Sequence, residues 1–154
     1  RAQPGDYDEA LRLVKQVHYM HYEHLSYLYN DIEPLPRDRF YEDLSNPDMI
    51  TLMAFDGRVA VGICEVEFKQ TGNNPVVRPR RLAYINDICV DENARGRGIG
   101  RALYERARAE SQARDCDSIE LMVWGFNENA LKFYKALGMD VRSYVMQDRL
   151  KLDD

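Results

Sequence analysis

The chain has 154 residues, of which 45% are hydrophobic and 31% are charged, and its formal net charge at pH 7 is −5. This size and composition predict a single globular domain spanning residues 1–154. The acidic balance argues against a dedicated nucleic-acid binder, and no apolar run approaches the roughly 18 residues that a membrane span needs, so we expect neither nucleic acid nor membrane as a partner.

The spacing of apolar residues alternates between helical and strand periods along the chain. A first helix follows Asp6, which resembles the N-cap of a capping box with Glu9, and Asp56-Gly57 predicts a tight hairpin turn. In chain order the pattern predicts a first helix that ends at about residue 29 and a second helix at 37–44, followed by strands at 50–55, 58–68 and 82–90. A helix at 99–114, a strand at 118–123, a helix at 127–137 and a strand at 139–149 complete the prediction.

This order combines an antiparallel hairpin with βαβ units. Because the crossover helices of βαβ units cover the faces of a sheet, we expect an α/β fold of the mixed α+β kind. The prediction is one mixed, mostly antiparallel sheet with helices on both faces.

The glycine-rich segment Arg95-Gly96-Arg97-Gly98-Ile99-Gly100 connects the expected strand 82–90 to the helix 99–114. It lacks the lysine and Ser/Thr of a nucleoside-triphosphate loop, and Arg101 occupies the position where a dinucleotide loop needs its third glycine. Glycines before a helix N-terminus still let backbone N–H groups converge on an anion, and the arginines add positive charge. On these residues alone, an anion site and a solvated turn both stay open.

The wider context resembles the GNAT acetyltransferase superfamily. Arg95-x-x-Gly98-x-Gly100 is similar to its [QR]-x-x-G-x-[GA] coenzyme A pyrophosphate loop. Upstream, "YINDICVDENARGRGIG" resembles the family's fourth strand, and downstream "SIELMVWGFNENALKFYKALGM" resembles its fifth strand and following helix. The similar core covers about 82–149. The resemblance implies the acyl-CoA N-acyltransferase fold, in which the parallel central strands splay apart.

The resemblance also implies a donor, acetyl-CoA, whose acetyl group passes directly to an amine without a metal. The backbone at the end of the fourth strand would pair with the pantetheine arm, and the loop would hold the diphosphate. Asn127 has two interpretations, a helix cap and a coenzyme A contact, which are compatible. The implied cofactor site consists of Ile88, Cys89, Val90, Arg95, Gly96, Arg97, Gly98, Ile99, Gly100, Arg101, Asn127 and Tyr134.

Two residues are candidates for proton transfer. Tyr134 matches the family's "FY..LG" tyrosine, and a phenol can protonate a departing thiolate, although helical periodicity alone favours a packing role. Asp87 is the carboxylate within strand 82–90 and is the expected base or substrate anchor. Asn86 cannot act as a base, so a route through water stays open, and Glu65 and Glu67 on the neighbouring strand are alternatives.

The first helices of this superfamily commonly form the acceptor wall. Here three histidines recur every third residue between 18 and 24, a spacing that suits surface or packed side chains better than a metal site. Tyrosines and acidic side chains in the same stretch suit a cationic acceptor. The expected acceptor residues are His21, Tyr22, Tyr29, Asn86 and Asp87.

Function is therefore predicted as N-acetyl transfer to the primary amine of a small molecule. A peptide or protein acceptor is one alternative, and an acyl-CoA-binding sensor without turnover is another. The odd number of cysteines, Cys64, Cys89 and Cys116, without CxxC spacing predicts buried free thiols in a reducing, cytoplasmic compartment. Similar proteins are often dimers, so a homodimer is one expectation for the assembly.

Overall fold

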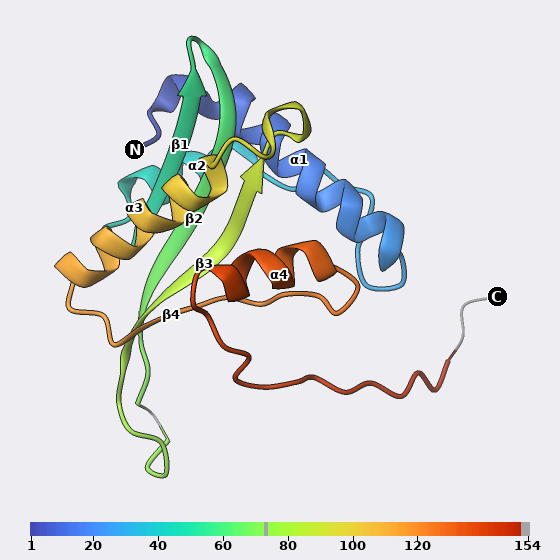
Figure 1. Cartoon of the computed structure of the whole chain (residues 1–154), viewed down its shortest axis with the longest axis vertical. Coiled ribbons are helices and arrows are strands. Elements are labelled where there is room, and N and C mark those ends of the chain that lie inside the picture. Colours follow the sequence, from blue (N-terminus) through green and yellow to red (C-terminus); the bar gives the residue numbers. More distant parts are fainter. Residues whose placement is uncertain (73, 152–154) are drawn as a thin grey trace.

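A computed structural model describes residues 1–72 and 74–151 (Figure 1). The chain begins with a short 3-10 helix, η1 (Pro4–Asp6), and a second one, η2 (Glu92–Ala94), follows the third strand. The remaining elements are, in chain order, α1 (Tyr7–His24), α2 (Arg37–Ser45), β1 (Met49–Asp56), β2 (Val59–Gln70), β3 (Arg81–Val90), α3 (Ile99–Ala113), β4 (Ser118–Glu120) and α4 (Glu128–Ala136).

The strands form one four-stranded sheet in the order β1-β2-β3-β4. β1 pairs with β2 and β2 with β3 in antiparallel fashion, whereas β3 and β4 run parallel. The predicted hairpin turn is present, and Gly57 has a φ of 63°, in the left-handed region that glycine enters without strain. The expected mixed, mostly antiparallel sheet is confirmed.

Helices cover both faces of this sheet. One apolar core lies beneath α1 and α2 and includes Leu13, Phe40 and Ile63. A second core lies on the opposite face beneath α3 and includes Leu52, Val66 and Leu103. Alternate residues of β2 therefore enter different cores, because successive side chains of a strand point to opposite faces.

The pairing of β3 with its two neighbouring strands is irregular on both sides. In the register with β2, Glu65 lies opposite Asp87 and Val66 opposite Ile85, so Asn86 forms a bulge. On the other side, β3 pairs with β4 through three residue pairs, Leu82 to Tyr84 with Ser118 to Glu120. Beyond Tyr84 the two parallel strands separate, and the β4-facing edge of β3 has no strand partner among the described residues.

Several predicted boundaries are wrong. α1 ends at His24, before Tyr29, because the following segment turns back and packs on the helix. The predicted capping box does not form: Glu9 accepts a hydrogen bond from the Ala60 N–H (2.8 Å) and binds Arg12. β4 ends at Glu120, before 123, since β3 has diverged from it.

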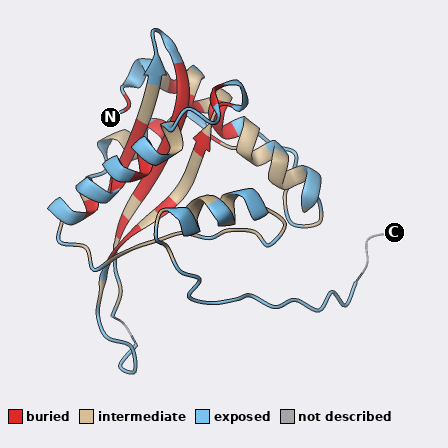
Figure 2. Cartoon of the chain, viewed as in Figure 1, coloured by how far each residue is buried: buried red, intermediate tan, exposed pale blue. Residues whose placement is uncertain are grey.

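The predicted strand at 139–149 is also wrong, because these residues form no strand in the structure. They run as an extended segment that passes below α4 in the view of Figure 1. Figure 2 shows that buried residues are concentrated in the first three strands and the helices packed on them, whereas the described residues after Ser111 are half-buried or exposed. No helix in the described part of the chain is long and apolar enough to cross a membrane.

Candidate active site

The loop between β3 and α3 presents unused backbone donors. In the described structure, the N–H groups from Arg95 to Arg101 donate to no other residue, while the flanking Ala94 and Ala102 N–H groups bond to Asp91 and Gly98 carbonyls (2.8 and 3.0 Å). Gly98 is the N-cap of α3 and supplies no side-chain cap. Unpaired N–H groups at a helix N-terminus bind anions, so this loop is suited to a diphosphate.

Glycine is needed in this loop for two reasons. Gly96 and Gly98 have φ values of 76° and 78°, which other residues adopt at a cost of about 1–2 kcal/mol. A Cβ added to either would meet no atom within 4 Å, which leaves the space above the backbone open. Gly100 instead faces inward, where an added Cβ would lie 3.2 Å from Phe133 Cζ. Phe133 thus packs against the first turn of α3.

The three arginines of the loop are exposed and differ in their contacts. Arg97 forms an ion pair with Asp56 (2.9 Å), and Arg95 donates through Nε to the Val90 carbonyl (3.3 Å). Arg101 projects from the first turn of α3. Surface ion pairs of this kind contribute little to stability, so Arg97 can exchange Asp56 for a phosphate at small cost.

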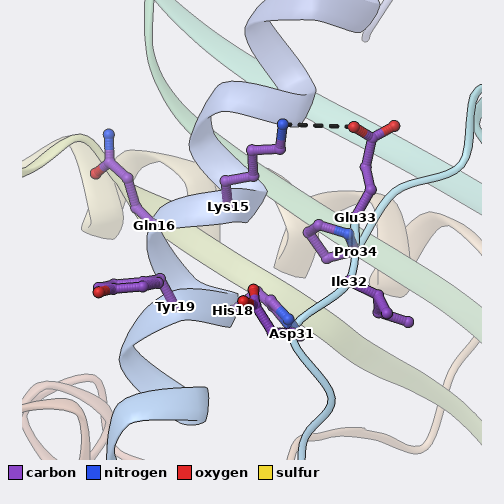
Figure 3. A pocket seen from close by; sticks show the side chains of 8 residues that line it. All are labelled: Lys15, Gln16, His18, Tyr19, Asp31, Ile32, Glu33 and Pro34. Atoms are coloured by element: carbon purple, nitrogen blue, oxygen red, sulfur yellow. Dashed lines mark ion pairs between the residues drawn. The ribbon is translucent and has the colours of Figure 1, made fainter.

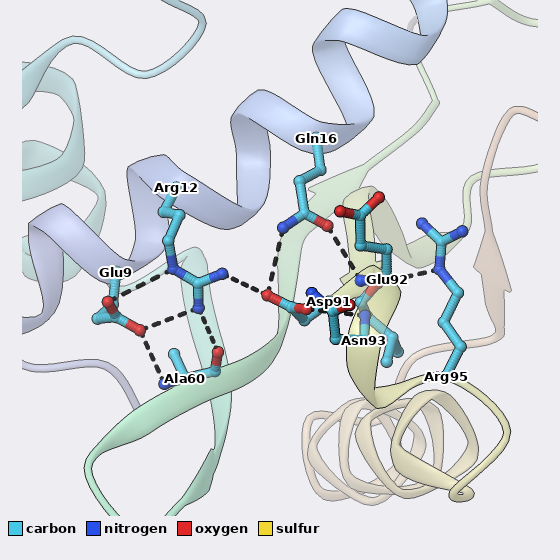
Figure 4. A network of polar contacts seen from close by, with 9 residues as sticks. Glu9, Arg12, Gln16, Ala60, Asp91, Glu92, Asn93 and Arg95 are labelled. Atoms are coloured by element: carbon cyan, nitrogen blue, oxygen red, sulfur yellow. Dashed lines mark hydrogen bonds and ion pairs between the residues drawn. The ribbon is translucent and has the colours of Figure 1, made fainter.

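A polar network holds the start of the loop in place (Figure 4). The Asp91 carboxylate binds the Arg12 guanidinium of α1, and it also accepts from the Asn93 N–H (3.0 Å) and Gln16 Nε2 (3.2 Å). These hydrogen bonds, with Arg12 contributing most, lower the pKa of Asp91 to about 2. Arg12 also binds Glu9, so the network ties α1 to the end of β3.

Tyr134 of α4 lies beside the separated part of the sheet. Burial raises the pKa of its phenol, and the nearby Cys64 and Asp87 act in the same direction. The phenol therefore keeps its proton at neutral pH and is available as a donor. Asn127 caps α4 by accepting from the Ala130 N–H (3.1 Å), as one of its two predicted interpretations requires.

Two carboxylates, the buried Glu65 and the half-buried Asp87, lie opposite each other on β2 and β3, on the face beneath α1 and α2. Burial raises the pKa of Glu65 to about 7, and Asp87 adds to the effect. Burial likewise raises the pKa of Asp87 to about 6, against the lowering influence of Arg39 and His18. Glu67, the other predicted alternative, is partly exposed and pairs with Lys69 (2.9 Å).

An aromatic cluster connects α1 to the segment that follows β4. Its members come from α1, from the segment after α1 and from the segment after β4: His18, His21, His24, Tyr29, Trp124 and Phe126. Trp124 Nε1 donates to Tyr29 Oη (2.9 Å), and the His24 and Phe126 rings stack at 4.2 Å. Half-burial lowers the pKa of His21. In the part of the chain that is described, no three candidate ligands converge in a metal-binding arrangement.

A pocket of about 570 Å³ lies between α1 and the segment leading to α2 (Figure 3). Its lining contains two carboxylates, Asp31 and Glu33, and one amine, Lys15, which pairs with Glu33 (3.4 Å). His18 also lines the pocket and bonds the Asn30 carbonyl (3.0 Å). The pocket lies beside α1, which covers the face of the sheet on which Glu65 and Asp87 lie.

The sequence-predicted residues thus fall into two groups. Loop 95–101 and the edge residues 88–90 share one end of β3, and Tyr134 and Asp87 influence each other electrostatically. His21 and Tyr29 meet in the aromatic cluster, but Tyr22 makes none of its ring contacts in the described structure. Sequence reasoning missed Trp124 and Phe126, although the single tryptophan of the chain directly after a predicted strand was a usable signal.

Comparison with known proteins identifies the family of the chain. The model of the acetyltransferase (GNAT) family matches residues 17–139. The chain belongs to the GNAT acetyltransferase family. Among solved structures, a variant of the BH1408 protein of Bacillus halodurans has a TM-score of 0.94 to this GNAT chain, at 33% identity over 97% of both chains.

Curated relatives of this GNAT chain are matched over part of their length. An uncharacterized N-acetyltransferase of Methanocaldococcus jannaschii is 36% identical over 92 residues, which are 54% of this chain and 40% of the relative. The thialysine N-epsilon-acetyltransferase of Bos taurus is 34% identical over 58 residues, 38% of this chain and 34% of the relative. The chain therefore aligns with less than half of the length of either relative.

Proposed function

We propose that this chain is an acetyl-CoA-dependent N-acetyltransferase of a single domain whose acceptor is a small cationic amine. The observation that carries the proposal is the open edge of β3. Unpaired N–H groups lie at one end of this edge, Asp87 belongs to the same strand, and Asp87 is close enough to Tyr134 to raise the pKa of its phenol. Family membership supports acetyl-CoA as the donor, and a more distant neighbour of the same fold is described in complex with a coenzyme A bisubstrate analogue.

The residues fit the donor in two places. The N–H groups of the 95–101 loop, with Arg95 and Arg101, would bind the diphosphate. The unpaired edge at Ile88 to Val90 would accept the pantetheine arm as a strand edge accepts a peptide. Acetyl-CoA supplies an activated acetyl group as its thioester.

Proton transfers to and from Asp87 and Tyr134 would complete the reaction. A primary ammonium with a pKa near 10.4 is neutral in about one part in 10³ at pH 7, so its proton must be removed. Asp87 is the proposed base because it is less deeply buried than Glu65 and neighbours both Tyr134 and the pocket residue His18. The amine nitrogen bonds to the acetyl carbon as the carbon–sulfur bond breaks, and Tyr134 Oη donates its proton to the departing thiolate sulfur. The acylated nitrogen then loses its second proton to the Tyr134 phenolate, which restores the phenol.

The pocket over α1 suggests a small, positively charged acceptor. Asp31 and Glu33 line the pocket, so a cation that enters it meets two carboxylates. The aromatic cluster beside it offers ring faces for a cation–π contact. A dedicated peptide acceptor would need an open groove, whereas the 30–36 segment closes one side of this pocket (Figure 3).

We expect release of free thiol from acetyl-CoA with small di- and polyamines and little release with neutral amines or peptides. The measurement is a thiol-trapping assay across a panel matched for amine pKa. Faster turnover with peptides would replace the small-amine proposal by the peptide one. Thermal stabilisation by coenzyme A with no thiol release from any amine would instead indicate the sensor.

Gly98→Glu should abolish binding of acetyl-CoA, because it places a carboxylate and a strained backbone where the diphosphate would lie. The readout is the rise in melting temperature caused by coenzyme A. Gly138→Glu is the matched control, since Gly138 also has a positive φ and open space around it but follows α4, outside the loop. Equal stabilisation of the two variants by coenzyme A would overturn the loop assignment.

A further inference from the structure

The pocket beside α1 already contains one positive charge of the protein itself. Lys15 extends from α1, and its Nζ lies 3.4 Å from Glu33 Oε2 on the facing segment (Figure 3). Each of the two side chains is 53% exposed, so water reaches the ion pair. The Lys15 ammonium therefore makes the same contact with a carboxylate that the pocket would offer to a cationic acceptor.

Glu33 has a second neighbour that keeps its carboxylate in place. Tyr7 Oη donates to the Leu35 carbonyl (2.9 Å) and lies 3.3 Å from Glu33 Oε1. Tyr7 is a buried residue whose ring packs edge-on against Phe40, so the position of its hydroxyl is fixed by the core. Because Tyr7 contacts Oε1 and Lys15 contacts Oε2, the carboxylate remains oriented when Lys15 leaves it.

Replacing Lys15 on Glu33 by another ammonium should cost little. An ion pair between exposed side chains contributes little to stability, because water screens the charges and both side chains lose freedom when they pair. The flexible four-carbon stem lets the released Lys15 ammonium move into water. Asp31 and Glu33 line the pocket against one lysine, so the excess of negative charge in the lining increases when Lys15 moves out.

We propose that Lys15 is a specificity-determining residue: its ammonium competes with the acceptor for Glu33, and the second ammonium of a diamine displaces it. The inference rests on the proposed function, because it takes this pocket as the acceptor site. The reacting amine would lie at Asp87, the proposed base, while the second ammonium replaces Lys15 Nζ on Glu33. A monoamine has no second charge for Glu33, so Lys15 stays paired. The pocket thus selects diamines over monoamines.

Steady-state kinetics with matched amines test the role of Lys15. The panel is a series of linear diamines that begins with putrescine, each compared with the monoamine of the same chain length. Lys15→Met should lower the KM for diamines by about 3- to 5-fold, the contribution of an exposed ion pair, and leave kcat and the KM for monoamines unchanged. Lys69→Met is the matched control, because Lys69 pairs with Glu67 outside the pocket (2.9 Å). An unchanged KM for diamines, or an equal fall for monoamines, would overturn the proposal.

A double-mutant cycle tests whether Lys15 acts through Glu33. Glu33→Gln removes the carboxylate for which the two ammonium groups compete, so the KM for diamines should rise. In this background, Lys15→Met should have no further effect on that KM. A fall of the same size in both backgrounds would show that Lys15 acts through the general charge of the pocket, and would refute the competition for Glu33.

Calorimetric titration of putrescine in the absence of acetyl-CoA separates this inference from the proposed function. Tighter binding to Lys15→Met than to the wild type would support the inference, and this result does not depend on turnover. The same result together with no acetylation of any amine would refute the proposed activity alone. Equal affinity of the two proteins together with normal acetyl transfer would refute the inference alone.

Discussion

Replacing Tyr134 by phenylalanine should lower kcat by about 10²–10⁴-fold, the usual contribution of a positioned general acid. The ring would still occupy its place on α4, so the KM for acetyl-CoA should change little. Burial raises the pKa of this phenol, which keeps the proton in place until a thiolate forms beside it. A steady-state assay of thiol release measures both parameters.

The matched control is Tyr104→Phe, because Tyr104 is also a buried tyrosine but belongs to the core beneath α3. A second measurement separates proton donation from packing. With an acetyl thioester of a more acidic thiol, the leaving group needs no proton, so the deficit of Tyr134→Phe should shrink. An undiminished kcat, or a deficit that is the same for both thioesters, would remove Tyr134 from the role of acid.

Local signals in the sequence predicted much of this molecule. The Asp56-Gly57 turn and the helix start after Gly98 depend on backbone conformations that glycine favours, so each can be recognised from a few residues. The bulge at Asn86 could not be recognised in this way, because it arises from the register between β2 and β3. Tyr29 was placed in a helix, yet it contacts Trp124, a residue far away in the sequence. Contacts of that kind override local helical periodicity.

The same distinction between local signals and contacts of distant residues applies to the candidate site. The loop that would bind the diphosphate is a continuous segment, so it can be predicted from the sequence alone. Glu65 and Glu67 lie on one face of β2, and which of them is buried depends on the cover provided by α2, where Arg39 and Asp43 influence Glu65. Residues 139–149 show a different limit: their pattern predicts a strand, but they form none in the structure, because no strand among the described residues pairs with them.

The protonation of Glu65 and Asp87 changes with pH and should affect both the proposed catalysis and the stability of the fold. Both carboxyls have a raised pKa in the folded chain, about 7 for Glu65 and about 6 for Asp87. The folded state therefore holds protons that the unfolded chain releases near pH 4. Their stabilising contribution is fully present below the unfolded pKa and is lost as the pH rises through the folded values. The ionised pair is thus a destabilising feature at neutral pH, which a catalytic role would explain.

Asp87→Asn should consequently lose activity and gain stability. We expect kcat/KM to fall by about 10²–10³-fold, and the rise of wild-type activity through about pH 6 to disappear from the residual rate. At about pH 8 the melting temperature of the variant should exceed that of the wild type, and this difference should vanish towards pH 4. Glu67→Gln, two residues from Glu65 on an exposed part of β2, should show neither effect. Full activity in Asp87→Asn together with loss in Glu65→Gln would transfer the base to Glu65, because the two carboxylates face each other across the same pair of strands.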